Sequence, residues 1–124
     1  MKKLFMLLMT SLTIGASHAQ STSVFNGTWV GQGYQLNNNE TWSITLTVHD
    51  GSIFIDYPSL GCNAKLTIVK SEENKLFLSE KMVKANTCLD NGKVELEWLS
   101  PNEIRYKWSF ANGTPGSFST LYKF

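Results

Sequence analysis

The sequence has 124 residues, of which 42% are hydrophobic, 12% aromatic and 17% charged. This length is enough for one small domain and leaves no room for a second. Eleven Lys and Arg residues stand against ten Asp and Glu, a formal net charge of +1. Such a balance argues against a nucleic-acid partner, which requires basic residues clustered on one face.

The first 19 residues have the pattern of a cleavable export signal. Lys2 and Lys3 supply a positive start, an apolar stretch runs from Leu4 to Ile14, and small residues end at Ala19, after which we expect the cut. The apolar stretch is shorter than the roughly 20 residues of a membrane-spanning helix. We therefore predict a signal peptide at 1–19 and a mature protein, residues 20–124, that has no membrane span and is periplasmic or secreted.

The mature chain alternates segments rich in β-branched and aromatic residues with Asn, Asp and Gly, which is typical of an antiparallel all-β meander. The clearest strand pattern places apolar side chains at every second position, at Trp42, Ile44, Leu46 and Val48. Asp50 and Gly51 follow at once and predict a tight hairpin turn. In the first half of the mature chain, strands are expected at 28–34, 42–49, 52–57 and 62–70, followed by a loop at 71–74.

The stretch 71–85 is ambiguous. Leu78, Met82 and Ala85 fit helical spacing, whereas the apolar residues at alternate positions fit a strand. We predict a strand, because a helix would leave its neighbours in the meander unpaired. A second hairpin is expected at Asn91 and Gly92, and the remaining strands at 94–98, 104–110 and 118–124. Eight such strands can close into a barrel that has no exposed edge; a two-sheet sandwich is the alternative.

Cys62 and Cys88 are the two cysteines of the chain. In an exported protein an even number of cysteines usually indicates a disulfide. Zinc requires three or four ligands at short spacings, and the mature chain has only His49 to join these two distant thiols. We therefore expect one disulfide, and neither a metal nor another cofactor.

Catalytic patterns are weak. His49 lies beside the Asp50 turn, where a histidine is usually solvated, and no nucleophile elbow accompanies it. Glu95 and Glu97 share a strand face, which favours pairing with Lys or Arg on neighbouring strands over glycosidase chemistry. The glycines of segment 31–33 lack the helix and the lysine of a phosphate-binding loop. We expect a protein that is not an enzyme.

Glu80 is the most informative carboxylate, because it lies in register with the apolar Leu78 and Met82. A buried carboxylate needs a backbone donor, a tyrosine hydroxyl or a basic side chain, or it serves as the polar anchor of a ligand cavity. A register slip of one residue would instead expose it to water. Trp42 and Tyr106 are likewise either core residues or part of a pocket.

The segment from Tyr57 to Gly61 is a candidate contact loop. Pro58 stiffens it and Cys62 follows it, so the loop would lose little entropy on binding. Ser59 and Leu60 are the side chains that it would present. The loop from Leu36 to Glu40 is a second candidate.

Two resemblances bear on fold and function. Residues 27–31, Gly-Thr-Trp-Val-Gly, look like the Gly-x-Trp start of lipocalin-type barrels, in which the Trp plugs the closed end. The run Tyr-Pro-Ser-Leu-Gly-Cys at 57–62, together with Leu66, Glu80, Cys88 and the aromatic strand 104–108, is similar to small domains of uncharacterised function in bacterial secreted proteins. This resemblance implies a barrel with a Cys62–Cys88 bridge and carries no activity. Periplasmic lysozyme inhibitors are similar in outline, being small exported barrels.

Taken together, these patterns predict an all-β, eight-stranded, lipocalin-like meander barrel with one disulfide. We expect a monomeric, non-enzymatic binding protein of the bacterial envelope. Its partner is either a small apolar ligand held inside the barrel or a protein bound at the rim, as in an inhibitor or immunity protein of an envelope hydrolase. The candidate site residues are Trp42, Tyr57, Ser59, Leu60, Glu80 and Tyr106.

Overall fold

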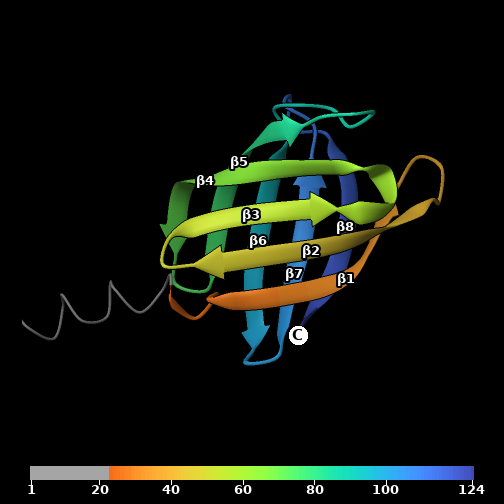
Figure 1. Cartoon of the computed structure of the whole chain (residues 1–124). Helices are drawn as coiled ribbons and strands as arrows, with labels where there is room; N and C mark the ends of the chain where they lie inside the picture. The colour runs from red at the N-terminus through yellow and green to blue at the C-terminus, as the bar shows by residue number, and fades with distance from the viewer. Residues whose placement is uncertain (1–22) are drawn as a thin grey trace, which may run out of the picture.

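A computed structural model describes residues 23–124 as a closed barrel of eight antiparallel strands (Figure 1). Each strand pairs with the next along the chain, and β8 closes the barrel on β1. The strands are β1 Gly27–Gln35, β2 Thr41–His49, β3 Ser52–Tyr57, β4 Cys62–Glu72, β5 Lys75–Lys84, β6 Lys93–Ser100, β7 Glu103–Ser109 and β8 Pro115–Lys123, with one short 3₁₀ turn, η1 Pro58–Leu60. The predicted meander barrel is confirmed. The predicted signal peptide at 1–19 and its cut lie outside the described residues.

The period of two in the sequence determines which side chains enter the barrel. In β2, Ile44, Leu46 and Val48 are buried while the residues between them are half-buried or exposed. The same alternation in the other strands fills the interior with aliphatic and aromatic side chains. Burial of this apolar surface, at about 25 cal/mol per Å², is the main force that holds the strands together.

Connections gather at two ends of the barrel, because successive strands run in opposite directions. The two-residue turns at 50–51, 73–74 and 101–102 lie at one end, together with the segment 23–26 before β1. Phe25 and Trp29 are completely buried here, and we call this the closed end. The longer connections 36–40, 58–61, 85–92 and 110–114 lie at the other end, which we call the open end.

The hairpin predicted at Asp50 and Gly51 is confirmed. Both residues have positive φ angles, 48° and 87°, as a two-residue turn of this type requires. The predicted strand in 71–85 is also confirmed, and the helical alternative is wrong. The expected loop at 71–74 is shorter than predicted, because Glu72 pairs with Lys75 across a turn of two residues.

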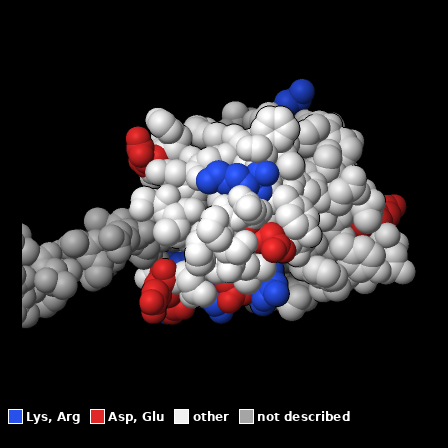
Figure 2. All heavy atoms as spheres, turned by 90° about the horizontal axis from the view of Figure 1, so that it is seen from below, with Lys and Arg blue, Asp and Glu red and all other residues white. Residues whose placement is uncertain are grey.

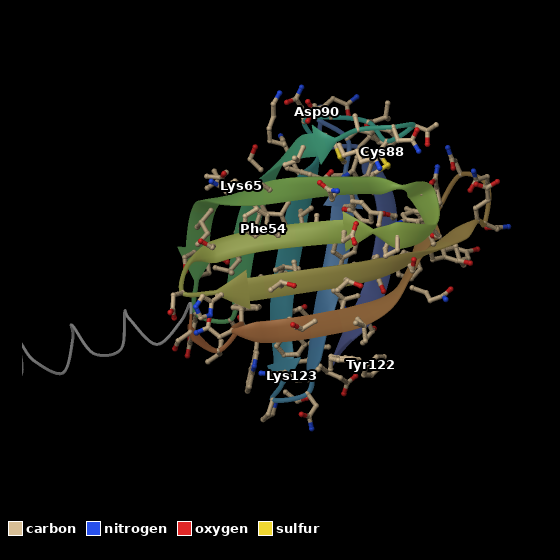
Figure 3. All side chains as sticks on the ribbon, viewed as in Figure 1. Phe54, Lys65, Cys88, Asp90, Tyr122 and Lys123 are labelled. Carbon is tan, nitrogen blue, oxygen red and sulfur yellow. A yellow bond between two sulfur atoms is a disulfide. The ribbon has the colours of Figure 1, made fainter. Side chains whose placement is uncertain are left out.

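The hairpin predicted at Asn91 and Gly92 is wrong. Asn91 does have a positive φ of 63°, but it is the seventh residue of an eight-residue connection, 85–92, between Lys84 and Lys93. This connection crosses the open end because Cys88 is bonded to Cys62 on β4, with a Cα–Cα distance of 6.3 Å. The predicted disulfide is confirmed, and Figure 3 shows it beside the label of Cys88, near Asp90 in the same connection.

The outer surface carries charges of both signs. On the face of residues 23–124 seen in Figure 2, basic and acidic side chains are scattered among uncharged ones. Glu97 pairs with Arg105 at 3.0 Å, and Glu95 lies 3.9 Å from both Lys75 and Lys107, as the strand-pairing interpretation of these two glutamates predicts. Within residues 23–124, no helix has the length and apolar character needed to cross a membrane.

Candidate functional site

The open end of the barrel contains a cavity of about 290 Å³. Its walls extend from exposed loop residues such as Asn38 and Leu89 down to buried strand residues such as Tyr57 and Glu80. The cavity therefore opens to solvent between the loops and reaches into the barrel. Its volume is close to the lower limit of small-molecule sites, about 300–1,000 Å³. Lining side chains include Trp42, Tyr57, Leu60, Glu80, Tyr106 and Trp108.

Strand alternation explains why these side chains meet. Trp42 is the second residue of β2, Tyr57 is the last of β3, and Glu80 and Tyr106 lie near the middle of β5 and β7. Each belongs to the inward row of its strand. Closure of the barrel then brings residues from distant parts of the sequence to the walls of one cavity.

Glycines hold the two tryptophans of the wall in place. A Cβ atom on Gly33 would lie 2.8 Å from the ring of Trp42, its cross-strand partner. On Gly116 it would lie 2.5 Å from the ring of Trp108, and on Gly92 2.3 Å from the indole nitrogen of that ring. These distances are too short for heavy atoms in contact, so any side chain at these positions would displace a ring. The ring of Trp42 thus occupies the space that a side chain at Gly33 would fill.

Glu80 is the central polar group of the cavity and is only 1% exposed. Its Oε2 accepts a hydrogen bond from the Tyr57 hydroxyl at 2.6 Å, and its Oε1 accepts one from the Trp108 indole N–H at 2.9 Å. The hydroxyl oxygens of Tyr57 and Tyr106 are 2.8 Å apart. Since Tyr57 donates its proton to Glu80, Tyr106 must donate to Tyr57. The predicted burial of Glu80 with a tyrosine hydroxyl as partner is confirmed.

The electrostatics of this network are unusual because its donors are all neutral. No Lys, Arg or His side chain is among the lining residues of the cavity. Burial raises the pKa of Glu80 above its ordinary 4.5, and Asp90 raises it further, although the hydrogen bonds from Tyr57 and Trp108 act in the opposite direction. Burial also raises the pKa values of Tyr57 and Tyr106, so both tyrosines keep their protons at neutral pH. Ionised Glu80 is therefore a buried charge with no cation beside it, which is costly.

Replacing Glu80 by Gln should change how stability depends on pH. Because the pKa of Glu80 is raised in the folded protein, folding favours the protonated carboxyl. Its contribution to stability is complete below about pH 4.5 and is lost as the pH rises through the raised folded-state pKa. Thermal unfolding measured from about pH 4 to 8 should show the wild type losing stability relative to Glu80→Gln as the pH rises. If the stability of the wild type and of Glu80→Gln changes with pH in parallel, the pKa of Glu80 is not raised in the folded protein.

Asp90 provides an internal comparison when the same titration is extended down to about pH 2. Its pKa is lowered to about 2 by hydrogen bonds from the backbone of Met82, the side chain of Lys81 and the backbone of Asn91. This exposed group therefore contributes stability above about pH 3.8, which is lost as the pH falls toward 2. The two carboxyl groups act in separate pH windows and with opposite signs, so they can be distinguished.

Two buried polar atoms of the cavity wall make no hydrogen bond. They are the indole Nε1 of Trp42 and the hydroxyl oxygen of Ser117. Ser117 is close enough to Tyr106 to lower the pKa of that phenol, but not in hydrogen-bonding geometry. An unpaired buried donor costs about 1–3 kcal/mol. This cost falls on the folded protein, since Trp42 Nε1 is buried against Gly33 of β1, where an added Cβ atom would lie 2.9 Å from it.

The rim beside the cavity is tied down at several points. Asp90 Oδ1 accepts hydrogen bonds from the backbone N–H groups of Met82 and Asn91, at 2.8 and 2.9 Å. The Asn86 amide donates to the Leu60 carbonyl oxygen at 2.8 Å, which joins the 85–92 connection to η1. Together with the disulfide, these contacts make the rim rigid before any ligand arrives.

Five of the six predicted site residues line the cavity, namely Trp42, Tyr57, Leu60, Glu80 and Tyr106. Ser59 is exposed and is not among the lining residues. Its hydroxyl accepts a hydrogen bond from the Ser43 N–H at 3.0 Å, and its own N–H donates to the Ser43 hydroxyl at 3.1 Å. Ser59 therefore fixes η1 to β2. The predicted loop 36–40 contributes Asn38 and Glu40 to the rim.

Sequence reasoning missed Trp108 and Ser117 as site residues. Trp108 belongs to the same alternating row as Tyr106, so the signal was present but was assigned to the core. Ser117 gave no signal, because the last strand was predicted to begin at residue 118, whereas β8 already begins at Pro115. His49 lies at the closed end with its side chain 85% exposed. Among residues 23–124, no three His, Cys, Asp or Glu side chains are grouped to hold a metal.

Comparison with known proteins identifies the fold alone. No family model and no curated protein matches the chain. A redesigned β-barrel, b11L5F_LGL, is 15% identical with a TM-score of 0.60, over 85% of this chain and 96% of its own. A second redesigned barrel, mFAP1 bound to DFHBI, is 14% identical with a TM-score of 0.59, over 84% and 99%. The resemblance to small secreted bacterial domains stays a prediction.

Proposed function

We propose that this chain is an exported, non-enzymatic binding protein that holds a small amphipathic molecule in the open end of its barrel. The cavity carries the proposal, because it combines apolar walls with a buried carboxylate and two tyrosine hydroxyls. Convergent polar groups in an apolar pocket are typical of ligand sites. The redesigned barrel that was solved with DFHBI bound supports the proposal, since a barrel of this fold can hold a small molecule.

Two further observations support the proposal. The Cys62–Cys88 bond is compatible with an oxidising compartment, as the predicted export signal requires. In the lining of the cavity, Cys88 is held in the disulfide and Glu80 is held by two hydrogen bonds from neutral side chains. Binding is the function that these residues support best.

A protein partner is the second candidate. Leu36 and Leu89, on two loops of the open end, are 49% and 59% exposed. Apolar side chains exposed on a rim that is already ordered can bind a protein at little cost in conformational entropy. Under this alternative the chain would be an inhibitor or immunity-like protein that presents its rim loops, including Ser59.

Two substitutions separate these candidates. Trp42→Ala removes one wall and the unpaired N–H, and we expect it to weaken binding of prodan, a neutral naphthalene dye, by at least about tenfold. Ser59→Glu changes the outside of the rim and should alter dye affinity by less than about threefold. Fluorescence titration of both variants and of the wild type measures the three dissociation constants. If Ser59→Glu impairs binding more than Trp42→Ala, the cavity is not the site.

A further inference from the structure

The carboxylate of Glu80 is in the cavity wall without a positive partner. Its hydrogen bonds come from the uncharged Tyr57 and Trp108, and no basic side chain lines the cavity. Hydrogen bonds from neutral donors compensate for part of the hydration that a buried carboxylate loses, and a positive charge beside it stabilises the anion further. The space beside Glu80 that such a charge could enter is the cavity itself.

Aromatic rings form much of the wall around this carboxylate. Trp108 and Phe110 pack edge to face, with ring centroids 4.8 Å apart and planes at 72°. The face of an aromatic ring is negative and attracts a cation that comes within about 6 Å of its centroid. Proteins hold quaternary ammonium groups among several such rings. The aromatic residues lining the cavity are Trp42, Tyr57, Tyr106, Trp108 and Phe110.

Charged groups near the mouth are also acidic. Glu40 lines the outer part of the cavity, and Asp90 is close enough to raise the pKa of Glu80. The nearby Lys81 is paired with Asp90 at 3.0 Å. The titratable groups that surround Glu80 are thus Tyr57 from β3, Tyr106 from β7 and Asp90 from the 85–92 connection, and Glu40 lies further out, at the mouth. Such a field attracts cations and repels anions.

From these three observations, and on the premise that the proposed function is correct, we infer that the ligand is a small organic cation. It is a quaternary ammonium ion or a protonated amine with apolar groups. Its charge lies among the rings with Glu80 as the counter-charge.

Choline and 3,3-dimethyl-1-butanol are matched probes for this inference. They share shape and hydroxyl group and differ in the replacement of the charged nitrogen by carbon. Calorimetric titration should show that the wild type binds choline at least about tenfold more tightly than the neutral alcohol. Glu80→Gln should weaken choline binding by about 30-fold or more and change binding of the alcohol by less than about threefold. Glu73→Gln, in the turn at the closed end, removes the same charge and should change neither.

Choline keeps its charge at every pH, so any pH dependence of its binding reports the ionisation of groups on the protein. Affinity for the wild type should rise as the pH increases from about 4 to 8 and Glu80 loses its proton. Binding to Glu80→Gln should vary less over this range. The pH profile of choline binding to the wild type needs no variant, so it tests the inference even if Glu80→Gln does not fold.

The outcomes separate the inference from the proposed function. Equal affinity for both probes, or choline binding that is the same at all pH values and in Glu80→Gln, would overturn the cation inference. If prodan still binds in that case, the cavity remains a site for small molecules. Failure of prodan, choline and the alcohol to bind would overturn both.

Discussion

Replacing Cys62 and Cys88 together by alanine should lower the free energy of unfolding by about 3 kcal/mol. The two residues are 26 positions apart, so the bond removes a substantial loop entropy from the unfolded chain. Alanine is chosen because Cys62 is fully buried and a serine there would bury a hydroxyl group. For a domain of this size the midpoint of thermal unfolding should fall by more than about 10 °C.

The same change should weaken ligand binding. Without the bond, the 85–92 connection is held at the rim by non-covalent contacts, which are the hydrogen bonds of Asp90, Asn86 and Gly92 and the ion pair of Asp90 with Lys81. A rim that must be ordered on binding costs conformational entropy, so prodan should bind less tightly. Reduction of the wild type should reproduce the midpoint of the double variant. If the double variant and the wild type have the same midpoint of thermal unfolding, the disulfide does not stabilise the fold.

Local patterns in the sequence were sufficient to predict most of the fold. Alternation in segment 42–49 predicts a half-buried strand, and the conformational freedom of Gly51 predicts the turn after it. Both depend on residues next to one another in the chain. The burial of Glu80 was predictable for the same reason, since it lies in the inward row that contains Leu78.

Features that depend on distant contacts could not be predicted. Asn91 has the positive φ of a hairpin residue, but Asp90 and the disulfide draw its segment into a longer connection. Ser59 was assigned to a contact surface because its bonds to Ser43 are invisible in the sequence. The cavity itself depends on how far eight rows of side chains fill the barrel, and pattern alone does not determine that.

The closed end of the barrel mainly stabilises the fold, and the open end contains the candidate site. At the closed end Trp29 is fully buried and its indole N–H donates to the Phe25 carbonyl at 2.8 Å. Lys123 lies over the Trp29 ring at 4.9 Å and also donates to the Asn26 carbonyl, and Figure 3 shows Lys123 away from the labelled Cys88 of the rim. At the open end Trp42 is only half-buried and its N–H is unpaired. Polar groups left unsatisfied at one end are characteristic of functional sites, and the well-packed other end compensates for their cost.

Trp29→Ala should therefore destabilise the fold strongly and leave binding nearly unchanged. Loss of a buried tryptophan costs about 3–5 kcal/mol, a large part of the roughly 5–15 kcal/mol that holds a small domain together. Urea unfolding followed by circular dichroism measures this loss. Prodan affinity of the folded variant should stay within about twofold of the wild type, since no residue of the closed end lines the cavity.

Trp29→Phe is the matched control for Trp29→Ala. It keeps a ring in the closed end but leaves the Phe25 carbonyl without its donor, so we expect a smaller loss, about 1–3 kcal/mol. Trp42→Ala should show the opposite profile, with a smaller loss of stability and weak binding, because its ring is half-buried and no hydrogen bond is lost. A tenfold loss of dye affinity in fully folded Trp29→Ala would mean that the closed end shapes the cavity, and the division between the two ends would be wrong.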